Sequence, residues 1–196
     1  ASFLSLSASL PLNVYIYGDH ILPHRRAWFS MVADALVPSV VRWKTARIEI
    51  PWPADNAELW RVLQCSSDSY SQLETLNISI NLDTWEDDSV DHPPGFEKLE
   101  ILRAPALANL VLQTWKSVWA IPVSWGELRE VTIGDSVDRG ALFNIISSCP
   151  KLSKLTLVVC SHLMSREPPS HIEGLIHANL TTMFLSYQHI PEIFFH

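Results

Sequence analysis

The 196-residue sequence contains little glycine, little cysteine and little positive charge. Six glycines, and no GxGxxG or GxxxxGK string, argue against a glycine-rich phosphate-binding loop. Three cysteines, Cys65, Cys149 and Cys160, are too few and odd in number for a disulfide-stabilised secreted scaffold, so we expect an intracellular protein. A formal charge of −7 disfavours a nucleic-acid partner. No apolar run reaches the roughly 18 residues of a membrane span, so we expect no membrane association.

The remaining composition is that of a globular protein, with 47% hydrophobic and 18% charged residues, 13 prolines and eight tryptophans. A chain of this length can form one good core or one solenoid of several turns. The first residues, ASFLSLSASLPLNVYIY, resemble a signal peptide in their apolarity. They lack its basic start, and their second half alternates like a strand, so we expect a chain cut from a longer one.

A leucine-rich pattern recurs along the chain. Its clearest copy lies in SSCPKLSKLTLVVC, where Leu152, Leu155, Leu157 and Cys160 fit the spacing LxxLxLxxN/C. The pattern recurs, in full or in its apolar half, from five other starting points: Trp43, Leu73, Leu107, Leu128 and Leu180. The starting points are about 21 to 34 residues apart, so the array is irregular compared with the usual roughly 20–29 residues.

The pattern predicts parallel strands separated by helices. Alternate residues of a strand point to the same face, so each unit has an apolar face that only a neighbouring unit can cover. Apolar positions at helical spacing follow three of the predicted strands, with Asn56, Asp138 and Ser170 as expected helix N-caps and Pro150 as a helix stop. A further amphipathic helix is predicted over residues 27–36, a return segment over 96–101, and an acidic loop over 83–95.

The order of these motifs is similar to the repeat region of F-box proteins. SSCPKLSKLTLVV resembles their CPxLxxLxL turn, and the succession SLPLNVYIYGD, RWKTARIEI, QLETLNISI and SWGELREVTI looks like the repeats of basidiomycete-type fungal F-box-like proteins. The resemblance covers roughly residues 9–187. It implies the substrate-binding part of a cullin-based ubiquitin ligase, in which the repeats hold a target protein. The F-box itself, LPxE followed by an amphipathic helix, is not found, so a Skp-type adaptor would bind only through an F-box outside this chain.

Candidate chemical sites are weaker than this structural pattern. The cysteines lack zinc-ligand spacing, and Pro23 separates His20 from His24. The string IGDSVD resembles the nucleophile block of GDS-type esterases, with Ser136 as nucleophile, but no DxxH pair follows near the C-terminus. We therefore expect no catalytic residue, no metal site and no cofactor.

The sequence thus predicts an α/β leucine-rich-repeat solenoid with parallel strands on its concave face and helices or loops on its convex face. Residues 1–42 would form a strand and a helix leading into the array, and residues 43–196 the repeats, truncated at both ends and continuing past His196. The expected function is non-catalytic protein recognition, with a repeat scaffold unrelated to ubiquitin ligases, and then an esterase, as alternatives. Strand alternation predicts these contact residues on the concave face: Arg47, Thr75, Asn77, Asn109, Glu130, Thr132, Lys154, Thr156, Thr182 and Phe184.

Overall fold

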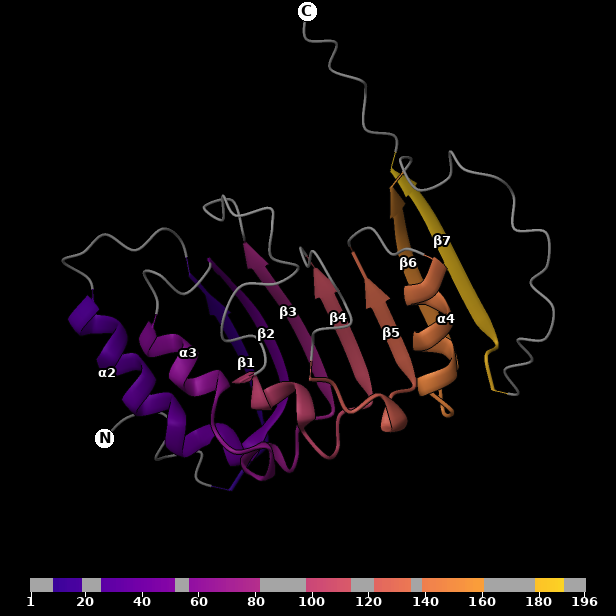
Figure 1. Ribbon diagram of the computed structural model, residues 1–196. Helices are drawn as coiled ribbons and strands as arrows, with labels where there is room; N and C mark the ends of the chain where they lie inside the picture. Colours follow the sequence, from indigo (N-terminus) through magenta and orange to yellow (C-terminus); the bar gives the residue numbers. More distant parts are fainter. Residues whose placement is uncertain are drawn as a thin grey trace, which may run out of the picture.

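The fold is α/β, with one open, all-parallel sheet of seven strands that follow one another in chain order (Figure 1). The computed structural model describes residues 9–18, 26–51, 57–81, 98–113, 122–134, 139–160 and 179–188. The strands are β1 (Leu12–Tyr17), β2 (Trp43–Pro51), β3 (Thr75–Asn81), β4 (Asn109–Gln113), β5 (Glu130–Ile133), β6 (Lys154–Cys160) and β7 (Thr182–Gln188). A sheet in which every strand pairs in parallel with the next is compatible with a solenoid-like arrangement.

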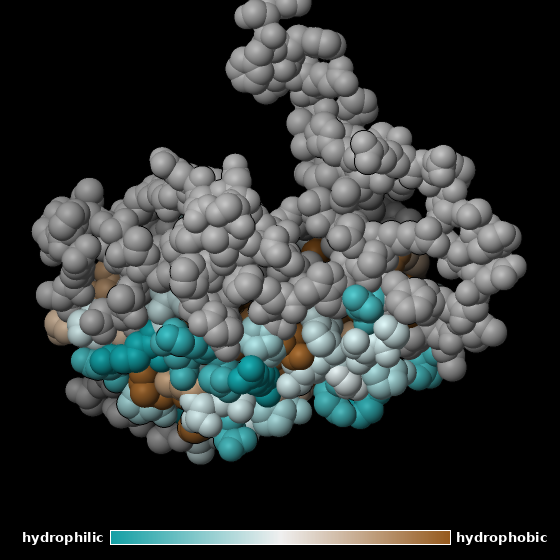
Figure 2. Space-filling view, in the orientation of Figure 1, coloured by the Kyte–Doolittle hydropathy of each residue, from teal (hydrophilic) through white to brown (hydrophobic). Residues whose placement is uncertain are grey.

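The described helices connect consecutive strands and pack against one face of the sheet, which we call the core face (Figure 1). Three are α-helices: α2 (Arg26–Leu36), α3 (Ala57–Leu63) and α4 (Arg139–Ser148). Short 3-10 helices complete several connections: η2 (Val37–Arg42), η4 (Ser67–Tyr70), η6 (Glu100–Arg103) and η7 (Trp125–Glu127). The surface seen in Figure 2 is mostly hydrophilic or intermediate where the structure describes it, with hydrophobic residues in scattered patches.

Three apolar columns run across the core face at the predicted spacing. The first column holds the residues at the strand entrances: Trp43, Leu73, Leu107, Leu128 and Leu152. The second holds Ala46, Leu76, Leu110, Val131 and Leu155, and the last holds Ile48, Ile78, Leu112, Ile133 and Leu157; in both of these the strands pair in register. All of these residues are fully buried. The last column continues from Ile16 of β1, which is half-buried. Parallel pairing in register therefore places like positions of successive units in contact.

The entrances of strands β2 to β6 repeat one hydrogen-bonding arrangement. The backbone N–H of the entrance residue donates to the carbonyl three residues earlier, as at Leu73 to Tyr70 (3.0 Å) and at Leu152 to Cys149 (3.0 Å). Farther along, one carbonyl accepts two N–H groups from the next unit; the carbonyl of Arg129, for example, accepts from Ser153 at 2.8 Å and Lys154 at 3.0 Å. These bonds satisfy the backbone groups that a turn before a strand would otherwise leave unpaired.

The local sequence predictions are mostly confirmed where they fall on described residues. The helix expected over residues 27–36 is α2. The described part of the expected return segment, residues 98–101, is no strand but leads into η6, and its Leu99 and Ile101 are buried. The helix before Pro150 is α4. Cys160, in the last slot of the LxxLxLxxN/C pattern, is the last residue of β6, because β6 continues its pairing with β7 to this point. Asn56, Asp138, Ser170, the acidic loop over 83–95 and the ends of the chain lie outside the described residues.

Candidate protein-binding face

The face of the sheet opposite the core face carries side chains in rows that cross the strands, and we call it the exposed face. The first row runs across all seven strands: Asn13, Thr45, Thr75, Asn109, Glu130, Lys154 and Thr182. The second row does the same: Tyr15, Arg47, Asn77, Val111, Thr132, Thr156 and Phe184. A shorter third row contains Tyr17, Glu49, Ser79 and Gln113.

All ten predicted contact residues lie in the first two rows, and none of them is buried. Arg47, Glu130, Lys154 and Phe184 are exposed. The others are half-buried, because neighbouring side chains on a pleated sheet cover one another: Thr75, Asn77, Asn109, Thr132, Thr156 and Thr182. The structure therefore brings residues from six strands onto one surface.

The charges of this face are paired within the face. The Arg47 guanidinium donates from Nε to Oε1 of Glu49 at 2.7 Å, and its Nη2 reaches the same oxygen at 2.5 Å. Nζ of Lys154 lies 3.5 Å from Oε2 of Glu130. Each pair is exposed, so each contributes at most about 1 kcal/mol to stability. Their pairing leaves the described part of these rows close to neutral.

The centre of the face is uncharged and, apart from Val111, polar. Nδ2 of Asn109 donates to Oγ1 of Thr75 at 3.1 Å, across strands β3 and β4. Oδ1 of Asn77 is buried and has no hydrogen-bond partner among the described residues. A buried acceptor without a donor costs about 1–3 kcal/mol, so this oxygen is a candidate for pairing with water or with a donor of a bound partner.

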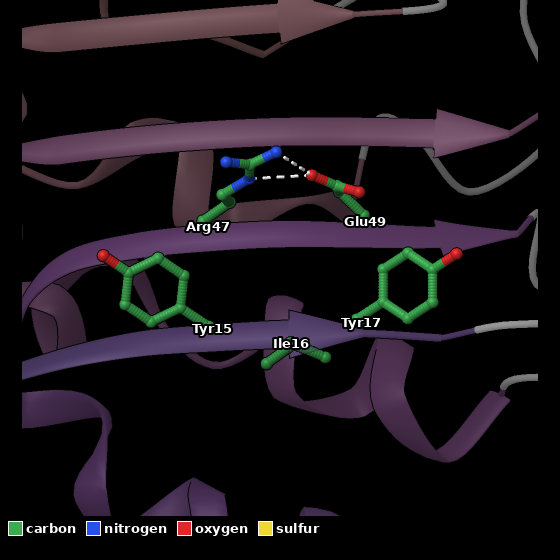
Figure 3. A pocket seen from close by; sticks show the side chains of 5 residues that line it. All are labelled: Tyr15, Ile16, Tyr17, Arg47 and Glu49. Atoms are coloured by element: carbon green, nitrogen blue, oxygen red, sulfur yellow. Dashed lines mark hydrogen bonds and ion pairs between the residues drawn. The ribbon is translucent and has the colours of Figure 1, made fainter.

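A shallow, open depression of about 260 Å³ lies at the β1 end of the exposed face, lined by Tyr15, Ile16, Tyr17, Arg47 and Glu49. Figure 3 shows the two tyrosine rings on either side of Ile16, their hydroxyls directed away from each other along β1. The paired Arg47 and Glu49 lie beside the gap between the rings. The two rings are highly exposed, Tyr15 at 73% and Tyr17 at 74%.

Sequence reasoning missed the tyrosines and Glu49. The predicted contact residues begin at Arg47, because residues 1–42 were expected to lead into the array; β1, within these residues, pairs in parallel with β2. A sequence signal for this strand was available, because the string NVYIY carries Val14 and Ile16 at alternate positions, as the repeat strands carry their buried residues. It was not decisive, because short alternating strings do not show which strand they pair with.

The structure describes little of the alternative chemical sites. Ser136 and all eight histidines lie outside the described residues. Cys149 is buried, and burial raises the pKa of its thiol to about 12, which disfavours the reactive thiolate. Nowhere in the described ranges do three His, Cys, Asp or Glu side chains gather so as to hold a metal ion. No helix among the described residues is long and apolar enough to cross a membrane.

Comparison with known proteins does not assign the chain to a family. A scan against protein-family models found no match, and searches of the curated proteins and of the solved structures found none either.

Proposed function

We propose that this chain is a non-catalytic protein-recognition module whose exposed sheet face binds a target protein. The observation that supports this most is the arrangement of the sheet: helices pack on the core face, while rows of exposed and half-buried side chains cross the other. The exposed rows combine tyrosine, arginine and phenylalanine with small polar residues. Aromatic residues and arginine are enriched in protein interfaces, which favours protein over small-molecule binding.

We further propose that the array is built of leucine-rich repeats. Two features support this: the three buried columns at the LxxLxL positions, and the recurring hydrogen bonds at the strand entrances. Units of this kind bury their apolar faces only against their neighbours, which is the physical basis of a repeat array. In such an array the exposed face is the concave one, and it is the usual binding surface.

The link to ubiquitin ligases rests on the resemblance of the repeats to those of F-box proteins. If it is right, the target held on the exposed face is a substrate for ubiquitin transfer, and a Skp-type adaptor binds through an F-box. Co-purification of a Skp-type adaptor with the full-length natural protein tests this. Purification without the adaptor leaves protein recognition as the function and removes the ligase role.

Site-specific crosslinking tests the recognition function itself. A photoreactive amino acid at Thr132, central on the exposed face, is expected to crosslink one discrete protein in cells that express the natural chain. The same amino acid at Asn144, an exposed position on α4, is the matched control and is expected to give no such product. Equal crosslinking from both positions, or crosslinking from α4 alone, would overturn the proposal.

Charge reversal then locates the contact more closely. Glu130→Lys and Lys154→Glu each place two like charges side by side on the exposed face, whereas the double variant restores an opposite pair. If the target contacts these residues, each single variant weakens the crosslink, and the double variant does not return it to full strength. A crosslink indifferent to all three variants would show that the target does not contact Glu130 and Lys154.

A further inference from the structure

Among the described residues, the exposed face carries exposed aromatic side chains at both ends: Tyr15 and Tyr17 on β1, and Phe184, 57% exposed, on β7. Tyr15 and Tyr17 are the most exposed large hydrophobic side chains among the described residues, and they flank the same depression. Other exposed apolar side chains, such as Met31 on α2 and Val41 on η2, lie on other elements. Scattered exposed apolar residues need no explanation, but adjacent ones that line a depression indicate an interaction site.

The charges around the depression favour an uncharged occupant. Both Nε and Nη2 of Arg47 are directed at Oε1 of Glu49, so the two charges neutralise each other at the edge of the depression. A cation or an anion entering the depression would lie near both Arg47 and Glu49, because the two side chains are in contact. Each would meet repulsion from one member of the pair and would gain little, whereas an apolar group meets the rings of Tyr15 and Tyr17. The side chain of Ile16, between the two tyrosines, packs on the core face.

The size of the depression favours a side chain over a free small molecule. Ligand pockets enclose about 300–1,000 Å³, whereas this depression measures about 260 Å³ and is open. It can therefore hold one side chain whose parent chain continues over the neighbouring surface. The tyrosine hydroxyls point to opposite ends of the depression (Figure 3), where each can donate to or accept from main-chain groups of that segment.

We propose that the depression between Tyr15 and Tyr17 is the anchoring site for the target protein. It takes one uncharged apolar side chain of an extended target segment, while the two hydroxyls pair with the segment's main chain on either side. This rests on the proposed function and deepens it, because it assigns the main anchor to β1 and β2 and not to the polar centre of the face. Residues that anchor interfaces are most often Trp, Tyr or Arg.

Selection of peptides tests the proposal without knowledge of the target. A phage-displayed library of random linear peptides is selected against the whole chain, and the enriched peptides are synthesised with a fluorophore for polarisation measurements. The selected peptides are expected to share one uncharged apolar residue. Tyr15→Ala and Tyr17→Ala are each expected to weaken binding at least about 10-fold, and Tyr15→Phe and Tyr17→Phe less, because they keep the ring and lose the hydroxyl.

Met31→Ala is the matched control, because Met31 is 71% exposed on α2 and so comparable in exposure to the tyrosines. It is expected to leave affinity within about 2-fold, and thermal unfolding checks that every variant is folded. Three outcomes would overturn the proposal of an anchoring site. They are peptides that bind the Tyr15→Ala/Tyr17→Ala double variant at full strength, peptides that require a charged anchor residue, and a selection in which no peptide is enriched at all. If the peptides instead lose affinity for the Glu130→Lys variant, the anchoring site is wrong while recognition by the exposed face stands. If they lose affinity only for the Met31→Ala variant, the anchoring site and recognition by the exposed face are both wrong.

Discussion

Leu155 offers the most direct test of how the sheet is stabilised. It lies in β6, is fully buried on the core face, and pairs in register with Val131 on one side and Met183 on the other. Leu155→Ala removes buried apolar atoms and leaves a cavity, which costs about 2–5 kcal/mol. Since domains are stable by only about 5–15 kcal/mol, this is a large fraction of the total. With a urea m value of about 2 kcal/mol/M, the midpoint should fall by about 1–2.5 M.

Two matched variants make this prediction specific. Thr156→Ala alters the next residue on the exposed face and should cost less than about 1 kcal/mol. Met183→Ala alters the same column as Leu155, but Met183 is 41% exposed, so little cavity forms and about 1 kcal/mol is expected. Urea unfolding followed by circular dichroism measures all three. If Met183→Ala or Thr156→Ala costs as much as Leu155→Ala, the reasoning from burial and strand alternation is refuted.

Three further predictions concern hydrogen bonding, pH and surface charge. Ser39→Ala removes the buried acceptor of the Trp43 indole N–H, 3.0 Å away, and should cost about 1–3 kcal/mol in urea unfolding; a cost below about 0.5 kcal/mol would contradict this role. Burial raises the pKa of Cys149 from 9.0 to about 12, so the unfolded chain loses its thiol proton first as pH rises. The free energy of unfolding should therefore fall above about pH 9, by at most about 1.4 kcal/mol per pH unit, and Cys149→Ala should remove that part of the slope. Glu130→Gln should change stability by less than about 1 kcal/mol, because its pairing with Lys154 is exposed; a larger loss would show that the pair is not a solvated one.

Much of the fold followed from local pattern. The LxxLxL spacing predicted which residues are buried, because a strand repeats every two residues and only one face can be covered. Leu73, Leu76 and Ile78, for example, are all fully buried as expected. The ten predicted contact residues lie on the opposite face for the same reason, although whether they bind a partner stays a prediction. The extent of β6 was less predictable, because a strand ends where its neighbour stops pairing, and this depends on β7.

The sequence by itself determined the alternation of strand and helix, the faces of the strands and the low positive charge. These depend on residues close together in the chain, whose periodicity and capping can be read directly. Only the tertiary structure decided that β1 belongs to the same sheet, which places Tyr15 and Tyr17 beside Arg47 and Glu49. About 30 residues separate these two pairs in the chain, and the register of two strands is a contact that short-range pattern does not encode. The depression at the end of the exposed face exists because of that register.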